Sequence, residues 1–454
     1  MEFKGRKVLV IGIARSGISA AKVLHQRGTI VDACDQKVVS QLGTKYHDIR
    51  PFCRQVHTGG YPRVAGNYDL VVVSPGVPLE IRPVIEAEQV GIPVIGEVEL
   101  AYLIKPSKVT FLAITGTNGK TTTTSLLQFI LANDGKKSIS AGNIGVPLTS
   151  LMNELEQGYI SIEMSSFQLA TTQTFKPKIS GLLNITPDHL DRHHTMEAYV
   201  QAKAKILANQ TSSDFTVLNY DDPTVCRLAA GCRSQVVYFS QEKILEKGTF
   251  IKNGKIIYAD NGQTIEICAV DRVLLRGKHN LENVLCAVTM AILADTGIDT
   301  IASSLMAFPG VRHRMEEVLT YKGVLYVNDS KATNPESAVK ALESFTRPII
   351  LIAGGRNKGS SFAGFAQVVR ERVKALVLVG EAKAEIKSAV IDAGFANIYE
   401  VEDFAAAIIT AHKLAGYGDI VLLSPACASW DMFESYEHRG DSFCHIIRDI
   451  TARG

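Results

Sequence analysis

The chain lacks the features that mark secreted, membrane-bound and disulfide-stabilised proteins. Its eight cysteines are scattered without a CxxC pair or regular spacing, so neither a disulfide framework nor a zinc site is indicated. Apolar runs such as 347–353 have the length of a strand, far short of a membrane span. The first residues lack the long apolar region and the cleavage site of a signal peptide. We therefore expect a cytoplasmic protein without membrane insertion.

An excess of charge of either sign is also missing. The formal net charge is +2, which gives no electrostatic reason to expect nucleic acid or an anionic membrane as a partner. No internal repeat or low-complexity tract is visible. The 454 residues, 46% of them hydrophobic, are typical of an ordinary globular protein. This length suggests about three domains.

The most informative segment is AITGTNGKTTTT at 113–124. The apolar run 109–114 before it predicts a buried strand, and the pattern of 122–133 after it predicts a helix. A Gly-rich turn between a strand and a helix N-terminus forms an anion site. The segment therefore predicts a phosphate-binding loop.

Each residue type in this loop suits phosphate chemistry. Gly116 and Gly119 allow backbone N–H groups to close on phosphate oxygens, Lys120 would neutralise charge, and the Thr121 hydroxyl suits Mg²⁺. The spacing departs from GxxxxGK[ST], because Ile114 stands where the first Gly would be. The alternative is that the segment is only a structural turn.

The N-terminal segment opens with a βαβ pattern of Rossmann type, with strands at 7–13 and 30–35. Its fingerprint, GIARSG at 12–17, has Ala14 in place of the second Gly. That Gly lets a pyrophosphate approach the backbone closely, so the change argues against a standard NAD site.

Another diphosphate remains possible at this end of the chain. A helix N-terminus near Ser16, with Arg15 beside it, could hold phosphate groups. Asp35 ends the second strand and is placed to meet a ribose or base, and Ser74 follows the strand 70–73. A purely structural role for this unit is the alternative.

A break at 105–107 separates that unit from a second one, in which two strands end in candidate metal ligands. The strand 159–163 ends in Glu163, and the strand 179–185 is followed by His189. Parallel strands end at the same edge as the phosphate loop, so both side chains are placed to hold Mg²⁺ near a triphosphate. A lone Glu or His is otherwise solvated or merely hydrogen-bonded.

A helix is expected over 196–208 and contains Lys203 and Lys205. By pattern alone both lysines are solvent-facing helix charges.

Hairpins are predicted farther along, with Asn-Gly turns at 253–254 and 261–262. An apolar helix then follows the segment 277–283. The Asn and His side chains at its start could cap the helix or contact a nucleotide base.

A third α/β unit starts near residue 311, and polar clusters follow its strands. Three such turns at one sheet edge suggest a binding face, although turn residues can also cluster by chance. The expected strands lie at 325–327, 348–353, 375–379 and 419–423, and the polar clusters at 328–334, 354–358 and 424–429.

Several short motifs, in one order along essentially the whole chain, resemble those of the Mur ligase family. One such loop is weak evidence, whereas this many motifs in the same order is strong. They are TGTNGKT at 115–121, GNIG at 142–145, Glu163 before two serines, NITPDH at 184–189, GKHNLEN at 277–283 and His313-Arg314.

Two further motifs resemble the branch of this family that adds D-glutamate. They are NDSKATNP at 328–335 and LSPACAS at 423–429, with the helix that trails to 439–440. The L-alanine-adding branch typically carries His where this chain has Asn118, and the DNPR motif of the diaminopimelate-adding branch is absent.

The resemblance implies an α/β fold of three domains. The implied domains are an N-terminal Rossmann-like UDP-binding domain at 1–106, a central P-loop ATPase-like domain at 107–310, and a C-terminal Rossmann-like domain at 311–454 that binds the amino acid.

The resemblance also implies an ATP-dependent amide ligase of peptidoglycan precursor synthesis. ATP would phosphorylate the carboxylate of UDP-N-acetylmuramoyl-L-alanine, and the amine of D-glutamate would attack the acyl phosphate, giving ADP and phosphate. The implied cofactors are ATP, two Mg²⁺ ions and a carbamylated Lys203. The implied partners are these small molecules, and a monomer is expected.

The family's functional residues carry over to matching positions. The implied catalytic residues are Lys120, Glu163, His189 and Lys203, and the metal ligands are Thr121, Glu163, His189 and Lys203. ATP would meet Gly116, Thr117, Asn118, Gly119, Lys120, Thr121, Thr122, Asn280, Asn283, Arg314, Asp329 and Lys331. The UDP substrate would meet Arg15, Ser16, Asp35, Ser74, Asn143 and His189. D-Glutamate would meet Thr333, Lys358, Ser429 and Tyr436.

Three alternatives stay open at this point. A nicotinamide-dependent dehydrogenase is disfavoured by Ala14 and by the separate ATP-type loop. A non-catalytic nucleotide-binding regulator would need no second metal. Another amide ligase of the superfamily, such as a folate-glutamate ligase, would lack the UDP-binding unit.

Some positions depart from the family pattern. Tyr436 stands where Phe is familiar, and Trp430 stands where a smaller apolar residue is usual. Gln36-Lys37 replaces a Thr-Arg pair familiar in some members.

Overall fold

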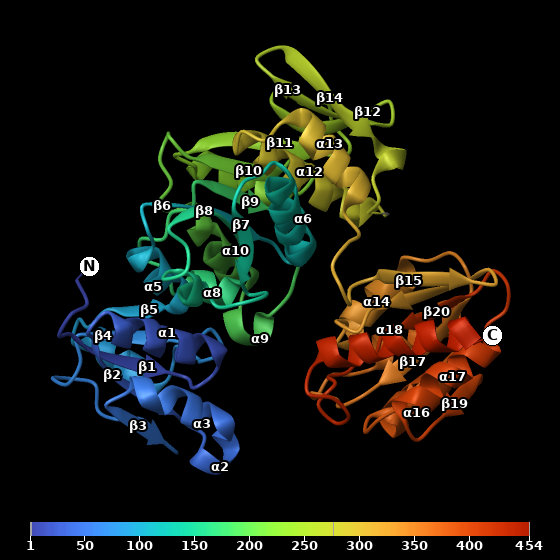
Figure 1. Ribbon diagram of the computed structural model, residues 1–454, viewed down its shortest axis with the longest axis horizontal. Helices are drawn as coiled ribbons and strands as arrows, with labels where there is room; N and C mark the ends of the chain where they lie inside the picture. The colour runs from blue at the N-terminus through green and yellow to red at the C-terminus, as the bar shows by residue number, and fades with distance from the viewer. Residues whose placement is uncertain (1, 276, 454) are drawn as a thin grey trace. The chain divides into compact units, whose positions relative to one another are not determined.

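The computed structural model describes residues 2–275 and 277–453 (Figure 1). The chain divides into two compact units, residues 1–308 and 309–454. Each is an α/β structure, as the sequence predicts, and the first contains two separate sheets. No helix in the described ranges combines the length and the hydropathy needed to cross a membrane.

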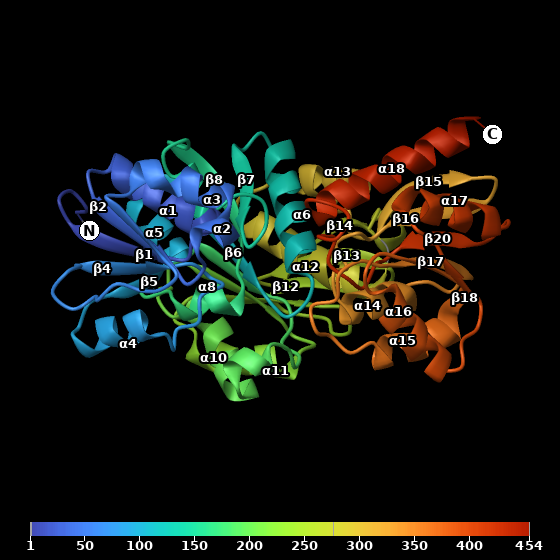
Figure 2. The same ribbon diagram turned by 90° about the horizontal axis from the view of Figure 1, so that it is seen from below.

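The N-terminal sheet has the parallel order β3-β2-β1-β4-β5. Val8 and Val10 of the central strand pack in the core on the side of α1, while Leu9 and Ile11 pack on the side of α4. Figure 2 shows α1 and α4 on opposite faces. A strand covered on both faces reads as a continuous apolar run, which explains why this strand is readily predicted. The elements are β1 (Lys7–Ile11), α1 (Arg15–Gln26), β2 (Ile30–Asp35), α2 (Val39–Leu42), α3 (Thr44–Ile49), β3 (Gln55–Thr58), β4 (Leu70–Val73), α4 (Arg82–Gln89), β5 (Val94–Gly96) and α5 (Glu97–Ile104).

The middle sheet has the order β14-β13-β12-β11-β10-β9-β6-β8-β7. Its strands from β7 to β12 are parallel, and β13 and β14 extend it as an antiparallel meander. Because β6 lies between β8 and β9, the segments that follow these three strands meet at one edge. The strands are β6 (Lys108–Thr115), β7 (Ser138–Gly142), β8 (Gln157–Glu163), β9 (Ile179–Leu182), β10 (Phe215–Asn219), β11 (Gln235–Ser240), β12 (Gly248–Lys252), β13 (Lys255–Asp260) and β14 (Gln263–Ala269).

Helices cover this sheet, and two pairs of them matter for the site. α12 packs against α6, and α10 packs against α8. The helices are α6 (Lys120–Asn133), α7 (Leu148–Leu151), α8 (Ser166–Ala170), α9 (Leu190–His193), α10 (Met196–Ala204), α11 (Pro223–Arg227), α12 (Lys278–Leu293) and α13 (Ile298–Ala307).

The two Asn-Gly turns predicted from the sequence are confirmed. Asn253 and Gly254 have φ of 50° and 72°, and Asn261 and Gly262 have φ of 51° and 79°. Positive φ at both central residues is the type I′ turn, whose twist matches that of the flanking strands. These turns join β12 to β13 and β13 to β14.

The N-terminal and middle sheets share a core. One apolar cluster contains Val8 and Val72 of the first sheet, Leu100 of α5, and Phe111 and Ile160 of the second. The shared core explains why these two domains form a single compact unit.

The C-terminal unit has the sheet order β15-β16-β20-β17-β18-β19, parallel except for β15. One face packs on α14, α15 and α16, and the other packs on α17 and α18 (Figure 2). The elements are β15 (Glu316–Tyr321), β16 (Val324–Asn328), α14 (Pro335–Glu343), β17 (Ile349–Gly354), α15 (Ala363–Arg372), β18 (Val373–Val379), α16 (Lys383–Asp392), β19 (Ile398–Glu400), α17 (Phe404–Leu414), β20 (Ile420–Leu423) and α18 (Tyr436–Arg453).

Candidate active site

The phosphate loop connects β6 to α6, as predicted from the sequence. Gly119, the N-cap of α6, has φ of 83° in the left-handed region that favours glycine. The Lys120 side chain turns back over the loop, and its Nζ donates to the carbonyl oxygens of Gly116, at 2.9 Å, and Thr117, at 2.8 Å. The loop is thus braced by the lysine that would neutralise a phosphate.

The segment after β9 holds the loop from one side. The N–H of Thr117 donates to the Asn184 carbonyl oxygen, and the N–H of Asn118 donates to Asn184 Oδ1, both at 2.8 Å. The Thr117 hydroxyl donates to the Thr186 carbonyl oxygen at 3.1 Å. The motif around Asn184 therefore has a structural role that its sequence did not reveal.

The start of α12 holds the loop from the other side. A Cβ atom at Gly119 would lie 2.0 Å from Asn283 Oδ1, so any other residue there would displace the Asn283 side chain. Asn283 is buried and its Nδ2 donates to Asn280 Oδ1 at 3.3 Å. The two predicted ATP-binding asparagines thus lie at the loop, while the side chain of His279, also singled out from the sequence, lies outside the described part of the structure.

Glu163 ends β8 and is 2% exposed. Its Oε1 accepts from Asn143 Nδ2 at 2.8 Å, and the Asn143 N–H donates to its carbonyl oxygen at 2.9 Å. Its Oε2 is buried without a hydrogen-bond partner among the described residues. A buried carboxylate oxygen without a donor is suited to a cation. Thr121, in the first turn of α6, is also buried.

The helix pattern alone predicted Lys203 as a solvent-facing charge, and this prediction is wrong because Lys203 is buried. It is 1% exposed, and its Nζ donates to the Gly116 carbonyl oxygen at 2.7 Å and lies 4.6 Å from the Tyr199 ring centroid. Burial and the nearby Lys120 ammonium lower the pKa of Lys203 well below its usual value, against the opposing field of Asp188. Lys205, by contrast, is exposed as expected.

The His189 side chain is more exposed than those of Glu163 and Lys203. Its side chain is 49% exposed, with Nε2 3.6 Å from Asp188 Oδ2. Its ring lies 5.1 Å from that of Phe167 and 6.5 Å from that of Tyr199. The Tyr199 hydroxyl reaches Thr117 Oγ1 at 3.2 Å, so this ring links His189 to the loop. Nothing in the sequence pointed to Tyr199.

No group of three or more His, Cys, Asp or Glu side chains in the described chain is arranged to hold a metal ion. The metal-binding role of His189 therefore stays a prediction.

Four of the six predicted UDP-binding residues lie at the turn between β1 and α1, whereas Asn143 and His189 lie near Glu163 and Tyr199. The Ser74 hydroxyl donates to the Gly12 carbonyl oxygen at 2.9 Å. Asp35 accepts from the N–H groups of Ile13, at 2.8 Å, and Lys37, at 2.9 Å. Both side chains thus have a structural role here, and Asp35 is only partly buried.

Arg15 and Ser16 begin α1. Arg15 is exposed, and its guanidinium donates to the Gly145 carbonyl oxygen in the GNIG segment. The same segment contains Asn143, so the candidate diphosphate site and Glu163 are connected through one loop.

In the C-terminal unit, Asp329 follows β16 and is buried. Its Oδ2 accepts from the Ser424 hydroxyl at 2.8 Å, and its Oδ1 accepts from the Met315 N–H at 3.2 Å. Burial raises the pKa of Asp329 to about 7, although the Ser424 hydrogen bond and the positive charge of Arg314 act in the opposite direction. Lys331 lies nearby in the same loop, with Nζ 6.0 Å from the Tyr436 ring.

Arg439 on α18 joins the loops that follow β16 and β20, and was not proposed as a site residue. It is buried, and its guanidinium donates to Ser330 Oγ at 3.0 Å and to the carbonyl oxygens of Ser330, at 2.9 Å, and Cys427, at 3.1 Å. Burial lowers its pKa to about 10. The position at the end of the LSPACAS-to-helix motif was the only sequence signal for it.

Three of the four predicted D-glutamate residues, Thr333, Lys358 and Ser429, lie on the loops after β16, β17 and β20, and Tyr436 begins α18. The Thr333 N–H donates to the Lys331 carbonyl oxygen at 2.8 Å, and Ser429 is 1% exposed. Lys358 is exposed, with Nζ 5.9 Å from the Trp430 ring. Because these strands are parallel neighbours, the loops share one edge of the sheet, as expected for a binding face.

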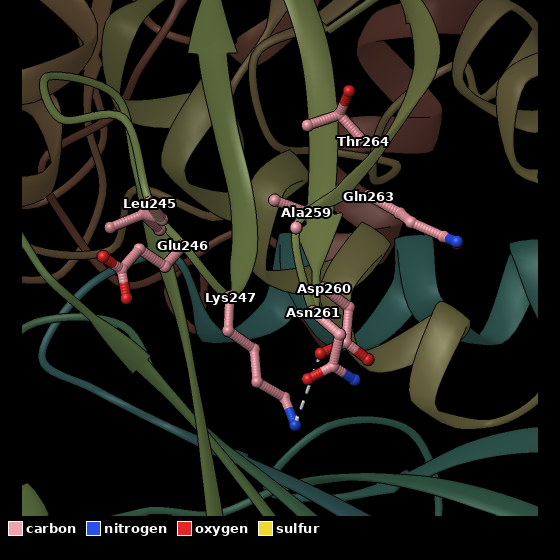
Figure 3. A pocket seen from close by; sticks show the side chains of 9 residues that line it. Leu245, Glu246, Lys247, Ala259, Asp260, Asn261, Gln263 and Thr264 are labelled. Atoms are coloured by element: carbon pink, nitrogen blue, oxygen red, sulfur yellow. Dashed lines mark ion pairs between the residues drawn. The ribbon is translucent and has the colours of Figure 1, made fainter.

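A separate polar hollow of about 470 Å³ lies at the outer end of the middle sheet. Figure 3 shows Lys247 pointing toward Asp260, with which it forms an ion pair of 3.6 Å. None of the predicted site residues lines this hollow. Its lining comprises Leu245, Glu246, Lys247, Ala259, Asp260, Asn261, Gly262, Gln263 and Thr264.

Family models match the chain in three successive parts. Residues 6–96 match the Mur ligase MurD-like N-terminal domain, residues 114–291 the Mur ligase middle domain, and residues 313–427 the Mur ligase glutamate ligase domain.

Curated relatives match the chain from end to end. A UDP-N-acetylmuramoylalanine–D-glutamate ligase from Pelotomaculum thermopropionicum is 47% identical over 99% of both chains. A protein of the same name from Clostridioides difficile is 44% identical over 99% of this chain and 100% of its own.

Solved structures share the fold at low identity. A UDP-N-acetylmuramate-alanine ligase from Thermotoga maritima aligns with a TM-score of 0.58 at 17% identity, covering 98% of this chain and 100% of that one. A pseudomurein peptide ligase type C from Methanothermus fervidus aligns with a TM-score of 0.56, also at 17% identity, with the same coverage.

Proposed function

Because this chain belongs to the Mur ligase family, we propose that it joins UDP-N-acetylmuramoyl-L-alanine to D-glutamate at the expense of ATP. The observation that carries the proposal is the end-to-end match, at 47% identity, to a relative with that activity in its name. This amide bond belongs to the synthesis of the peptidoglycan precursor.

The chemistry has two steps. The substrate carboxylate attacks the γ-phosphorus of ATP, the bond to the β-γ bridging oxygen breaks, and ADP leaves an acyl phosphate. The amine of D-glutamate then attacks the acyl carbon, loses a proton, and expels phosphate. Lys120 and the backbone N–H groups of the loop stabilise the charge on the transferring phosphoryl group.

Magnesium fits the residues at the loop. Glu163 offers a buried Oε2 for which the described residues provide no donor, and Thr121 is buried at the start of α6. These two side chains would hold one Mg²⁺, and His189 with modified Lys203 would hold a second. The ions would neutralise charge on the ATP phosphates when bound.

Lys203 is the residue we propose to carry a carbamate. Its amine is buried and its pKa is lowered, first by burial and then by Lys120, so the neutral amine that reacts with CO₂ is favoured. Bond formation between the neutral Nζ and the CO₂ carbon, with loss of one Nζ proton, gives a carbamate whose oxygens can ligate a metal. The nearby Lys120 ammonium would also stabilise the negative carbamate.

The remaining assignments follow the three domains. We propose boundaries at 1–106, 107–310 and 311–454, with the uridine diphosphate on the first domain and D-glutamate on the third. Lys358 would pair with a carboxylate of D-glutamate. We expect the protein to act as a monomer in the cytoplasm.

A phosphate-release assay with a panel of amino acids tests the function. We expect phosphate only when ATP, UDP-N-acetylmuramoyl-L-alanine and D-glutamate are all present. Replacing D-glutamate by L-glutamate, L-alanine or diaminopimelate supplies the controls. Equal release with one of these amino acids would contradict the assignment and indicate another amide ligase of the superfamily.

The carbamate is tested by comparing two lysines of one segment. Lys203→Met should abolish most turnover, and excess bicarbonate should not restore it, whereas Lys205→Met should retain most activity because Lys205 is exposed. Carbon-13 NMR with labelled bicarbonate should show a carbamate resonance in the wild type and in Lys205→Met only. The same resonance in Lys203→Met would remove the proposal.

A further inference from the structure

We propose that Trp430 is a positioning residue that holds the Lys358 ammonium ready for a carboxylate of the incoming amino acid. The inference rests on the proposed function, because it assumes that Lys358 binds D-glutamate. It adds to that function an aromatic residue whose ring positions the Lys358 cation.

The first observation is the pair itself. Lys358 Nζ lies 5.9 Å from the centre of the Trp430 ring, within the distance of a cation–π contact. The Trp430 side chain is 61% exposed and is the only indole of the chain. Burial therefore does not hold this ring in place.

The second observation is that the backbone fixes both residues beside each other. Arg356 and Ala428 exchange two backbone hydrogen bonds, of 2.9 Å and 3.1 Å, which join the loop after β17 to the loop after β20. Asp431 Oδ2 accepts from the Glu381 N–H at 3.0 Å and anchors the residue after Trp430.

The loop that carries Lys358 is also closed locally. Asn357 Oδ1 accepts from the N–H groups of Gly359, at 3.1 Å, and Ser360, at 2.9 Å. The separation of the two backbone segments is therefore fixed by hydrogen bonds, and the Lys358 and Trp430 side chains are left to move.

The third observation concerns charge. Arg356, two residues before Lys358, is already engaged, because its guanidinium donates to both carboxylate oxygens of Glu381 at 2.8 Å. Among residues 2–275 and 277–453, no carboxylate lies within ion-pair distance of Lys358. Arg356 already binds a carboxylate. Lys358 contacts the Trp430 ring, and a ligand carboxylate can readily bind it in addition to that contact.

A cation–π contact suits this task because it is weak and keeps the charge available. A carboxylate forms a stronger, charge-assisted hydrogen bond, so it can capture the ammonium without first breaking an ion pair. The ring restricts the flexible lysine before binding and so reduces the entropy lost on binding. The effect belongs to binding and should appear in KM rather than kcat.

A double-mutant cycle on the full-length enzyme tests the pair. KM and kcat for D-glutamate are measured for the wild type, Trp430→Leu, Lys358→Met and the double variant, with Trp430→Phe keeping an aromatic face. Tyr417→Leu is the matched control, because Tyr417 is a 91% exposed ring of the same unit outside the candidate site.

We expect Trp430→Leu to raise KM for D-glutamate by about two- to five-fold with kcat little changed, and Trp430→Phe to raise it less. Lys358→Met should raise KM by about ten-fold or more. In the Lys358→Met background the further change to Leu at position 430 should have no effect on KM. Tyr417→Leu should match the wild type.

Two other outcomes are distinguishable. An active wild type whose KM is unchanged by Trp430→Leu, or a Trp430→Leu effect that persists in the Lys358→Met background, overturns this inference and leaves the proposed function intact. A wild type that releases no phosphate with D-glutamate overturns the proposed function and the inference together.

Discussion

Asp329 is a carboxyl group whose environment changes its charge near neutral pH. It is buried between the ends of β16 and β20, and burial raises its pKa from 3.8 to about 7. The Ser424 hydroxyl and the Met315 N–H donate to its oxygens, which only partly offsets the loss of water. The folded protein therefore keeps a proton on this group that the unfolded chain releases.

The first prediction is a pH dependence of stability. Between about pH 4 and pH 7 the folded state binds one more proton at this site than the unfolded state, so the stabilising contribution present at low pH is lost as the pH rises through 7. At about 1.4 kcal/mol per pKa unit, the total loss is at most about 4 kcal/mol. Asp329→Asn removes this loss and should be more stable than the wild type at pH 8, with the difference shrinking toward pH 4.

The measurement is urea unfolding between pH 4 and pH 8, followed by the fluorescence of Trp430 in the same unit. Asp392→Asn, at an exposed carboxyl of that unit, is the control, and its curve should run parallel to that of the wild type because it keeps Asp329. Parallel curves for the wild type and Asp329→Asn would contradict the prediction.

At the level of elements, both ends of α6 have a glycine with positive φ. Gly119, the N-cap, has φ of 83°, and Gly135, just past the C-terminus, has φ of 75°. They differ in their surroundings. A Cβ at Gly119 would lie 2.0 Å from buried Asn283 Oδ1, whereas a Cβ at Gly135 would meet no heavy atom within 4 Å among those described.

The second prediction compares alanine substitutions at Gly119 and Gly135. Gly135→Ala should cost about 1 kcal/mol of stability from backbone strain alone, with unchanged affinity for ATP. Gly119→Ala adds a collision with a side chain that has little room to move, so it should cost more and weaken ATP binding by about ten-fold or more. Thermal unfolding and equilibrium ATP binding separate the two effects, and equal ATP affinity in both variants would show that the loop tolerates a Cβ.

Local signals explain which elements could be predicted from the sequence. The strand β6, the helix α6 and the Asn-Gly turns are encoded by neighbouring residues, so their patterns were sufficient. Glu163 was found because the ends of parallel strands share an edge.

Contacts between segments distant in sequence explain what could not be predicted. Lys203 sits on a helix whose pattern indicated a solvent-facing charge, but α10 places it against the carbonyl oxygen of Gly116, far away in sequence. The positions of Tyr199 and Arg439 depend likewise on tertiary packing. The family resemblance, rather than the pattern, assigned a role to Lys203.

At the level of the whole molecule, the chain has two compact units, and each unit has its own apolar cores. The N-terminal and middle sheets share one apolar core, while residues 309–454 have cores of their own. We therefore expect the two domains of the first unit to unfold together and the C-terminal unit to unfold separately.

Glu99 tests this division because it joins the first two domains. It is buried on α5, and its carboxylate accepts from the N–H groups of Gln173, at 2.9 Å, Thr174, at 2.7 Å, and Phe175, at 3.0 Å. In Glu99→Gln an NH₂ group faces these donors, so at least one hydrogen bond is replaced by a repulsive contact. The cost should be about 3 kcal/mol.

The third prediction is that Glu99→Gln lowers only one of two unfolding transitions. Circular dichroism reports both units, whereas the fluorescence of Trp430 reports the C-terminal unit alone. We expect the first-unit transition to fall by roughly 5 °C while the Trp430 transition stays in place. Glu88→Gln, at an exposed carboxylate of the same domain, should shift neither transition. If the Trp430 transition falls together with the circular dichroism signal, the chain unfolds as one cooperative body, and the shared core of residues 1–308 does not set a separate unit of stability.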